Sequence, residues 1–358
     1  MDSAFFRSIV RLSRDVLGFS DIGIFSLDSN LISDPVHISK NREIYEHLKT
    51  TTRNKHDWAK TIIVLIRPYT PYTIDFPNGY GIYSAHYKQY PNGRKSTQIL
   101  ESFIEDAGFH ASGDSGIPVK AAAFCAGLGR YGKNSLIYTN EYGSFITIHT
   151  VVTDALFDYD DCLLGEVTDC GECNICIDIC PTKAIRSDGS LIKGRCLREH
   201  MLSKNIVPLD MRKLFGKCIL GCDICQIVCP KNRARYKEAV MPSDEEVKAF
   251  DIDNILSDND ESNISLDFIE SIIGANYAKR EQVLSTAAII AGNMKEMRFF
   301  PKLIKLLNDI NPAVRVHVAW ALHEIDAKSA EVELKCAISK EADEKVKLEL
   351  ESLLAIGL

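Results

Sequence analysis

The sequence predicts a mixed α/β (α+β) domain at the N-terminus, a cysteine-rich segment after it, and an all-helical region at the C-terminus. Strand-like and helix-like segments alternate over residues 1–160, two sets of four cysteines lie within residues 161–235, and apolar positions recur at helical spacing over residues 273–358. A chain of 358 residues, of which 46% are hydrophobic and 25% charged, is long enough for two or three globular domains.

The N-terminal 1–160 domain carries apolar patterns of both periods. Phe5, Phe6 and Ile9 recur at helical spacing, whereas Thr61-Ile-Ile-Val-Leu-Ile66 is a β-branched run typical of a buried strand. Because strands and helices alternate, we expect an α/β or α+β domain here. The predicted elements, in chain order, are a helix over 5–17, strands over 21–27 and 61–66, a helix over 96–108, and strands over 136–138 and 144–152 that pair around a turn at 140–143.

The two cysteine sets have the spacing of iron–sulfur ligands. The first, Cys170-Gly-Glu-Cys173-Asn-Ile-Cys176-Ile-Asp-Ile-Cys180-Pro181, is the C-x2-C-x2-C-x3-C-P run of two-cluster ferredoxins, in which the last cysteine serves the other cluster. The second, Cys222-Asp-Ile-Cys225-Gln-Ile-Val-Cys229-Pro230, is completed by Cys196 ahead of it. We therefore expect a ferredoxin-like domain over 161–235 with two 4Fe–4S clusters, the first held by Cys170, Cys173, Cys176 and Cys229 and the second by Cys196, Cys222, Cys225 and Cys180.

Zinc and disulfides are the alternatives for these cysteines. A structural zinc site takes two pairs of ligands, so a third cysteine followed by C-x3-C-P is surplus to it. Disulfides require an oxidising compartment, and the N-terminus lacks the basic and apolar regions of a signal peptide. No apolar run approaches the ~18–20 residues needed to span a bilayer. We therefore expect a cytoplasmic protein with no membrane partner.

The remaining four cysteines belong to neither set. Cys218 lies four residues before Cys222 and could replace Cys196 as a ligand, although we expect it to be a spare thiol. Cys125, Cys162 and Cys336 are isolated in the sequence and are expected to be small buried apolar residues.

Two further regions follow the cysteines. Residues 236–272 are expected to form an acidic linker, because eight acidic residues stand against Lys248 over 244–262. Residues 273–358 are expected to form HEAT-like helical repeats, in which Ala288-Ile-Ile-Ala-Gly292 corresponds to Ala319-Trp-Ala-Leu-His323. Over 279–317 seven basic residues stand against three acidic ones, a surplus that suits either phosphate contacts or a solvated helical surface.

A glycine-rich loop carries the most specific signal outside the cysteines. The segment Ala126-Gly-Leu-Gly-Arg-Tyr-Gly-Lys-Asn134, taken with Glu141-Tyr-Gly-Ser-Phe145 and Gly221-Cys-Asp-Ile-Cys-Gln-Ile-Val-Cys-Pro-Lys-Asn232, resembles the epoxyqueuosine reductase family. The HEAT-like repeats are similar to that family too, and the resemblance covers most of the chain. The family consists of cobalamin-dependent iron–sulfur reductases that reduce the epoxide of epoxyqueuosine in tRNA to give queuosine.

The resemblance implies a cobalamin-binding N-terminal domain, two 4Fe–4S clusters that relay electrons to cobalt, tRNA as a partner, and an electron donor such as a flavodoxin or ferredoxin. Asp114 is the implied general acid, although Gly116 is an extra residue before Pro118 and Val119-Lys120 replaces the family's acid–Arg pair. His86 could line the pocket or be a surface histidine. The implied cofactor-binding residues are Gly127, Gly129, Tyr131, Gly132, Lys133, Asn134, Gly143 and Ser144.

Two other functions stay open at this point. The chain could be a two-cluster electron-transfer or corrinoid-reducing protein without substrate chemistry of its own. It could also be a related reductase that acts on a small molecule, because the residues around Asp114 differ from the family pattern. Binding of a corrinoid separates the first alternative from the enzyme, and turnover of tRNA separates the second.

Overall fold

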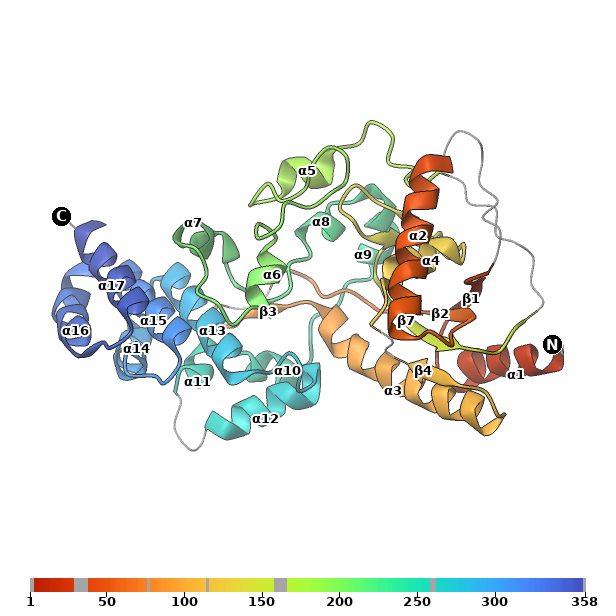
Figure 1. Cartoon of the computed structure of the whole chain (residues 1–358). Helices are drawn as coiled ribbons and strands as arrows, with labels where there is room; N and C mark the ends of the chain where they lie inside the picture. Colours follow the sequence, from red (N-terminus) through yellow and green to blue (C-terminus); the bar gives the residue numbers. More distant parts are fainter. Residues whose placement is uncertain are drawn as a thin grey trace.

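The computed structural model describes residues 3–28, 38–75, 78–113, 116–157, 166–257 and 262–356. These residues form an elongated molecule with the sheet of the N-terminal domain at one end and the C-terminal helices at the other (Figure 1). The cysteine-bearing loops lie between the two ends, next to the short helices α5, α6 and α8 (Figure 1).

The N-terminal domain is built on a four-stranded antiparallel sheet, which makes it an α+β domain. The strand order is β1 (Asp21–Ser26), β2 (Thr61–Pro68), β7 (Ile146–Thr153) and β4 (Ala111–Gly113). The predicted pairing of 136–138 with 144–152 is wrong, since β7 pairs with β2 along its whole length and with β4 at Val151–Thr153. Instead β6 (Ile137–Tyr138) pairs with β5 (Arg130–Tyr131) in the glycine loop.

Helices cover both faces of this sheet. Ile62, Val64 and Ile66 of β2 point to one apolar core, whereas Ile63 and Leu65 point to another, as the alternation of a strand requires. Both faces of β2 are buried, which explains why nearly all residues of the run at 61–66 are apolar. The first core is closed by α2 (Ile38–Lys55) and α4 (Val119–Cys125), and the second by α1 (Ser3–Arg11), the π-helical turn Leu12–Val16 and α3 (Ala85–Asp106).

Helix α3 begins eleven residues earlier than predicted, at Ala85 instead of residue 96. The Ser84 side chain caps it by accepting a hydrogen bond from the His86 N–H. Pro91 and Gly93 lie inside the helix, where both residue types are normally unfavourable. Gly93 is required because a Cβ there would stand 2.1 Å from Nε2 of His149 on β7. Contact with the sheet therefore outweighs local propensity.

Replacing Gly93 with alanine is expected to destabilise the protein, although alanine favours a helix by about 1 kcal/mol over glycine. The added Cβ would push the buried His149 ring away from its contacts. Thermal unfolding of Gly93→Ala should therefore show a lower midpoint than the wild type. Asn92→Ala, at the exposed neighbouring position, is the matched control and should not lower it. An unchanged midpoint in Gly93→Ala would contradict this account.

The cysteine-rich segment consists of short elements joined by loops. Its strand β8 (Cys218–Leu220) pairs in parallel with β3 (Ile82–Tyr83), which lies just before α3 and ties this segment to the N-terminal part of the chain. The remaining elements are α5 (Ile175–Ile179), α6 (Leu197–Met201), α7 (Leu209–Arg212), the 3-10 turns Lys213–Phe215 and Pro230–Asn232, α8 (Ile224–Ile227) and α9 (Arg233–Tyr236).

The segment predicted as an acidic linker is folded wherever the structure describes it. It forms α10 (Asp244–Ala249), α11 (Ile252–Ile255) and α12 (Ser262–Ile273). The three acids that open α10 stabilise the positive end of the helix, and Ser243 forms a capping box with Glu246. Charge therefore marks a helix start here, while Phe250, Ile252, Ile255 and Ile269 are buried in the core.

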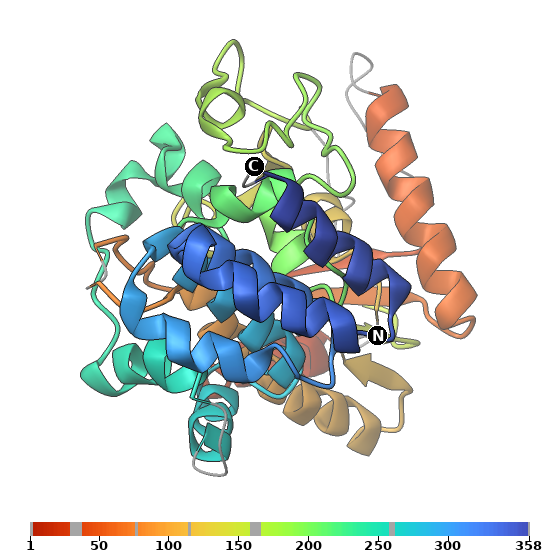
Figure 2. The ribbon, with the colours of Figure 1, turned by 90° about the vertical axis from the view of Figure 1, so that its left-hand side faces the viewer.

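The C-terminal region is wholly helical over its described residues and stacks in layers. Helix α13 (Arg280–Met294) packs on α15 (Pro312–Ile325), which also contacts α14 (Phe300–Leu306), α16 (Ala327–Lys340) and α17 (Glu344–Ile356). The two echoing sequences lie in α13 and α15, where Gly292 lets the helices approach, since a Cβ there would stand 2.7 Å from the Trp320 ring. Figure 2 shows these helices lying across the front of the molecule.

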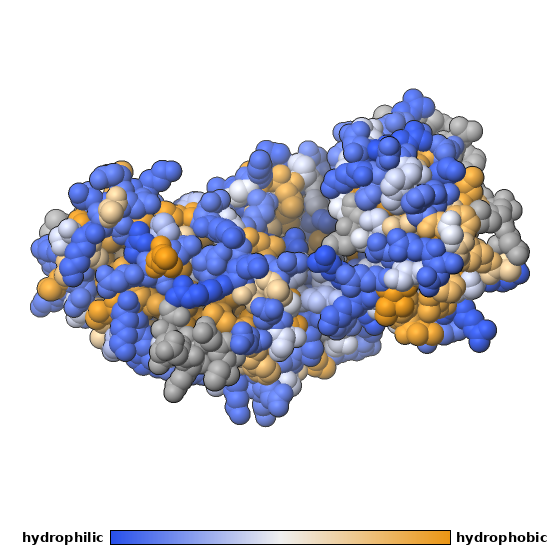
Figure 3. All heavy atoms as spheres, turned by 60° about the horizontal axis from the view of Figure 1, so that its bottom comes forward, coloured by the Kyte–Doolittle hydropathy of each residue, from blue (hydrophilic) through white to orange (hydrophobic). Residues whose placement is uncertain are grey.

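The surface is mainly hydrophilic. Figure 3 shows polar side chains over most of one long face, interrupted by small apolar groups. Across the described residues, no helix is both long and apolar enough to cross a bilayer.

Candidate functional site

The two cysteine loops face each other through their short helices. Helix α5 begins after the first C-x2-C and contains Cys176, helix α8 begins two residues after Cys222 and contains Cys225, and the two helices pack together. Cys180 and Cys229 come at the C-terminal ends of these helices, each held in an extended conformation before a proline. This arrangement carries the last cysteine of each loop toward the other loop.

The thiols of the two loops influence one another electrostatically. Burial, and then the thiols of Cys170, Cys229 and Cys173, raises the pKa of Cys176. Burial raises the pKa of Cys225 to about 12, with further contributions from Asp223, Cys196, Cys176 and Cys180. Cys229 is therefore within electrostatic reach of Cys176, and both Cys176 and Cys180 are within reach of Cys225.

Over the residues that the structure describes, no three His, Cys, Asp or Glu side chains converge closely enough to hold one metal ion. In a 4Fe–4S cluster, by contrast, each of the four thiolates binds a different iron.

The two groups differ in exposure. Cys173 is exposed, whereas the other seven predicted ligands are half-buried. Cys180 also accepts a hydrogen bond from the Ala184 N–H at 3.3 Å and lies 3.5 Å from the Thr182 hydroxyl. Such bonds to sulfur are among the factors that set the potential of an iron–sulfur cluster. Because it contains the exposed Cys173, the first group lies nearer to solvent than the second.

Four other cysteines bear on the sequence predictions. Cys125 is buried as expected, but Cys336 is exposed on α16, so the prediction that it is a buried residue is wrong. Cys162 lies outside the described residues. Cys218 lies near Cys222, whose pKa is raised by burial and then by the Cys218 thiol, so Cys218 adjoins the second group.

The glycine loop contacts the cysteine loops. Lys133 Nζ donates to the Gly171 carbonyl at 2.7 Å and to Asn174 Oδ1 at 2.9 Å, beside the first group. Asn134 Nδ2 donates to Tyr138 Oη at 2.7 Å and to the Cys225 carbonyl at 3.2 Å, beside the second. These two predicted cofactor-binding side chains therefore hold the seam between the N-terminal domain and the cysteine-rich segment.

The glycines of the loop are explained by packing within the chain. A Cβ at Gly129 would lie 2.6 Å from Ile137, and one at Gly132 would lie 2.6 Å from the Tyr138 ring. Gly127 follows α4 with a φ of 71°, a conformation that favours glycine. The Tyr131 N–H donates to the Val167 carbonyl at 2.8 Å, so the loop is pinned on that side as well.

A buried hydrogen-bond network joins Ser144 to the second cysteine loop. Asn232, fully buried, accepts from the Ser144 N–H at 2.9 Å and donates to Ser144 Oγ and the Gln226 carbonyl, both at 2.8 Å. Ser144 Oγ in turn donates to Gln226 Oε1 at 2.9 Å. Gly143 has a φ of 57°, and a Cβ there would stand 2.1 Å from Asn232 Oδ1. Asn232 was missed as a site residue, although it ends the Cys-Pro-Lys-Asn motif.

A cavity of 220 Å³ lies between α3, the start of α4 and β7. It is lined by Tyr90, Arg94, Thr97, Gly116, Ile117, Val119, Ile148, His149 and Thr150. Asp114, the predicted general acid, lies outside the described residues, but Gly116 and Ile117 of the same motif line this cavity. The cavity is therefore the concave site that belongs with the predicted catalytic segment.

Two imidazoles lie at this site. His149 stacks on Tyr90 with ring centroids 4.9 Å apart, and Tyr90 lies 5.7 Å from His86. Burial lowers the pKa of His149 to about 4, and burial with the charges of Arg198, His149 and Lys120 lowers that of His86 to about 3. Both rings are therefore neutral at pH 7. His86 had an open role from sequence, whereas His149 sits in an apolar strand and gave no signal.

The low pKa of His149 predicts acid sensitivity. Because the unfolded imidazole titrates near 6.5, the stability from its neutral form is complete above pH 6.5 and is lost as pH falls toward 4. The thermal midpoint of the wild type should therefore drop more between pH 7 and pH 5 than that of His149→Gln. His47→Gln, at an exposed helix position, should keep the full drop. Equal drops in all three proteins would contradict the assignment.

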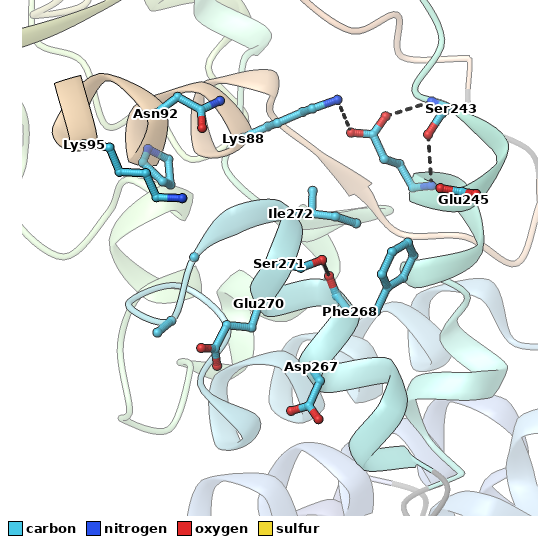
Figure 4. Close-up of a pocket in the computed structure, with 14 residues that line it drawn as sticks. Lys88, Asn92, Lys95, Ser243, Glu245, Asp267, Phe268, Glu270, Ser271 and Ile272 are labelled. Atoms are coloured by element: carbon cyan, nitrogen blue, oxygen red, sulfur yellow. Dashed lines mark hydrogen bonds and ion pairs between the residues drawn. The ribbon is translucent and has the colours of Figure 1, made fainter.

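A larger pocket of 680 Å³ lies on the opposite side of α3, against α10 and α12 (Figure 4). Lys88 pairs with Glu246, which also closes the capping box of α10, so these groups already have structural partners. Lys95, Glu245, Asp267 and Glu270 give the remaining wall both signs of charge. The pocket faces away from the cysteine groups and the imidazoles, so we assign the chemistry to the smaller cavity.

The basic surplus at 279–317 is mostly engaged within the protein. Arg315 holds the nearly buried Glu341 through two nitrogens, at 2.7 and 2.8 Å. The other pairs are Arg280 with Asp309, Lys295 with Glu324, Arg298 with Glu296, and Lys302 with Asp253. Five of the seven basic residues therefore stabilise the helices, which favours the solvated-surface interpretation over phosphate contacts.

Comparison with known proteins places these features in a wider group. Residues 169–232 match the family model described as a 4Fe-4S double cluster binding domain. The epoxyqueuosine reductase of Bacillus subtilis is 30% identical over 269 residues, which are 72% of this chain and 67% of the relative.

Solved structures agree in fold. The epoxyqueuosine reductase from Streptococcus thermophilus superposes with a TM-score of 0.74 over 100% of both chains, at 25% identity. An epoxyqueuosine reductase with a tRNA-Tyr epoxyqueuosine-modified stem loop superposes with a TM-score of 0.78, at 23% identity, over 99% of this chain and 98% of the other. The similarity therefore extends over the sheet domain, the cysteine loops and the C-terminal helices together.

Proposed function

Because the chain belongs to the epoxyqueuosine reductase family, we propose that it reduces the epoxide of epoxyqueuosine in tRNA to give queuosine. The observation that carries this proposal is the presence in one fold of a double-cluster cysteine segment and a cavity lined by the neutral imidazole of His149. Removing an epoxide oxygen as water consumes two electrons and two protons, so such an enzyme needs both a supply of electrons and an acid.

The electrons are assigned to two 4Fe–4S clusters with crossed ligands. The first is proposed to use Cys170, Cys173, Cys176 and Cys229, and the second Cys196, Cys222, Cys225 and Cys180. The exposed Cys173 supports entry of electrons at the first cluster from a protein donor such as a flavodoxin or ferredoxin. The second cluster would pass them toward the cavity. Arg198 and Lys120 act electrostatically both on His86 and on Cys196 of this cluster.

Cobalamin is the implied cofactor at the cavity, and the groups present there fit it in chemistry. The side arms of a corrin are neutral amides, which suit the uncharged imidazole of His149 and the donor groups of Arg94 on the cavity wall, and the neutral His86 lies next to the wall residue Tyr90. The 220 Å³ cavity is smaller than the ~300–1,000 Å³ typical of ligand sites, so it accommodates only part of so large a group. The chemistry that a bound cobalamin supplies is a strongly reducing cobalt centre.

The proton is assigned to Asp114. The two histidines cannot serve as acids at neutral pH, because burial holds their pKa values near 3 and 4. A carboxylic acid at Asp114 would have to keep its proton near neutral pH in order to donate it to the epoxide oxygen. Asp114→Asn should therefore abolish turnover while leaving cofactor binding intact, and Asp114→Glu should retain part of the rate. Retained turnover in Asp114→Asn would exclude this role.

The function is tested by anaerobic reconstitution with iron, sulfide and cobalamin, followed by incubation with epoxyqueuosine-containing tRNA and dithionite. We expect a corrinoid absorption band that co-elutes with the protein and the appearance of queuosine in the digested tRNA. Clusters without a bound corrinoid would favour the electron-transfer protein. A bound corrinoid without conversion of tRNA would favour the small-molecule reductase.

A further inference from the structure

Lys120, on the first turn of α4, is the residue of the catalytic segment that no role yet explains. Its ammonium donates to the Ser135 carbonyl at 2.7 Å and is half-buried. Ser135 follows Asn134, whose side chain donates to the carbonyl of Cys225. Lys120 is therefore fixed against the loop that carries a ligand of the second cluster.

Arg198 follows another assigned ligand of the same cluster. It lies in α6, two residues after Cys196, and its Nε donates to Tyr87 Oη at 2.7 Å. Its guanidinium also stands 5.7 Å from the centre of the Tyr87 ring. The aromatic contact and the hydrogen bond hold the charge of Arg198 in place, and the buried carboxyl group of Asp223, between Cys222 and Cys225, lies within its electrostatic reach.

We propose that Lys120 and Arg198 make the second cluster easier to reduce, so that electrons entering at the exposed first cluster collect beside the cavity. The proposal rests on the cluster ligands assigned under the proposed function. Each one-electron reduction by a low-potential donor adds one negative charge to a cluster and its thiolates. Fixed cations nearby stabilise that added charge, and they do so more strongly in a partly desolvated site than in water.

The electrostatics of the two side chains agree with this position. Burial and then Arg198 lower the pKa of Lys120, whereas Cys196 and Cys225 oppose the shift and favour its charged form. The neighbouring phenol of Tyr87 and the thiol of Cys196 likewise favour the charged form of Arg198. Both cations therefore lie within electrostatic reach of the second cluster.

The chain offers a matched control in Lys133. Lys133 belongs to the same α4–β6 segment, but its ammonium is bonded to Gly171 and Asn174 in the loop of the first cluster. The two lysines thus lie in one stretch of chain but are held next to different clusters. Removing each charge in turn separates a local electrostatic effect from a general disturbance of the fold.

The test is a reductive titration of the cluster-loaded protein with dithionite, followed by electron paramagnetic resonance, without cobalamin or substrate. Lys120→Met should lower the equilibrium constant for reduction of the second cluster about tenfold, which is 59 mV for one electron, and should leave the first unchanged. Lys133→Met should shift the first cluster and leave the second unchanged. Lys120→Arg, which keeps the charge, should restore the wild-type potential.

An unmoved second potential in a Lys120→Met protein with full iron content would overturn the proposal, as would equal shifts of both clusters in both lysine variants. If Lys120→Met does not retain its clusters, Arg198→Gln is titrated in its place with the same expectation for the second cluster. Because the readout is a potential, its failure leaves the proposed activity on tRNA untouched. If the tRNA assay fails, the cluster potentials can still be measured, because the titration uses neither tRNA nor cobalamin.

Discussion

Cys229→Ser is expected to lose the first cluster, and Cys180→Ser the second, although each cysteine stands in the sequence motif of the other. Helix α5 packs on α8, and Cys229 lies within electrostatic reach of Cys176, as Cys180 does of Cys225. Removing one of four thiolates leaves an iron without its protein ligand, so each variant should retain about four of its eight irons. Iron analysis after anaerobic reconstitution measures this loss.

Double variants decide whether the ligands cross. Cys170→Ser with Cys229→Ser should lose no more iron than either change alone, because both residues serve one cluster. Cys170→Ser with Cys180→Ser should lose nearly all iron, because the two residues serve different clusters. The reverse pattern would show that each motif binds its own cluster. Cys336→Ser, at an exposed site on α16, is the control and should keep all its iron.

Asn232→Leu is expected to destabilise the protein by about 3 kcal/mol or more and to loosen the second cysteine loop. The change leaves the buried Ser144 N–H and Gln226 carbonyl without the partners seen here, and each such loss costs about 1–3 kcal/mol. Urea unfolding of the reconstituted protein measures the stability, and loss of iron on gel filtration measures the loop. Asn254→Leu, at an exposed position of α11, should change neither.

The coupling of Asn232 to Ser144 gives a stricter test of the same network. Ser144→Ala removes the hydroxyl that Asn232 Nδ2 contacts, so the two changes share an interaction. In a double-variant cycle their free energies of unfolding should deviate from additivity by about 1 kcal/mol or more. Additive effects would mean that the two side chains act independently and that the seam is held elsewhere.

Several features could be predicted from the sequence because their signals are local. The strand at 61–66 is a continuous β-branched run, which identifies a buried strand without knowledge of its neighbours. The spacing within each cysteine set can be read directly from the sequence, and this spacing is typical of iron–sulfur ligands. The helical character of residues 273–356 could also be predicted, because the spacing of apolar residues along a helix can be recognised within a short stretch of sequence.

Other features depended on contacts between distant segments. Pro91 and Gly93 hid the first half of α3, since both oppose a helix unless the sheet surface behind it requires them. The acids at 244–246 suggested a linker, but they are a helix start whose apolar face is buried by other helices. The strand at 137–138 pairs with Arg130–Tyr131 of the glycine loop, and no strand signal in the sequence of that loop suggested this partner.

The sequence by itself therefore determined the two cysteine sets with their spacing, the order of the α+β, cysteine-rich and helical parts, and the family. Only the tertiary structure decided that Lys133, Asn134 and Ser144 hold the seam to the cysteine loops, and that Tyr90, on the wall of the cavity, contacts both His86 and His149. The physical reason is that thiolate spacing along a loop is set by covalent geometry. The partners of a buried side chain are set by elements that meet only when the chain has folded.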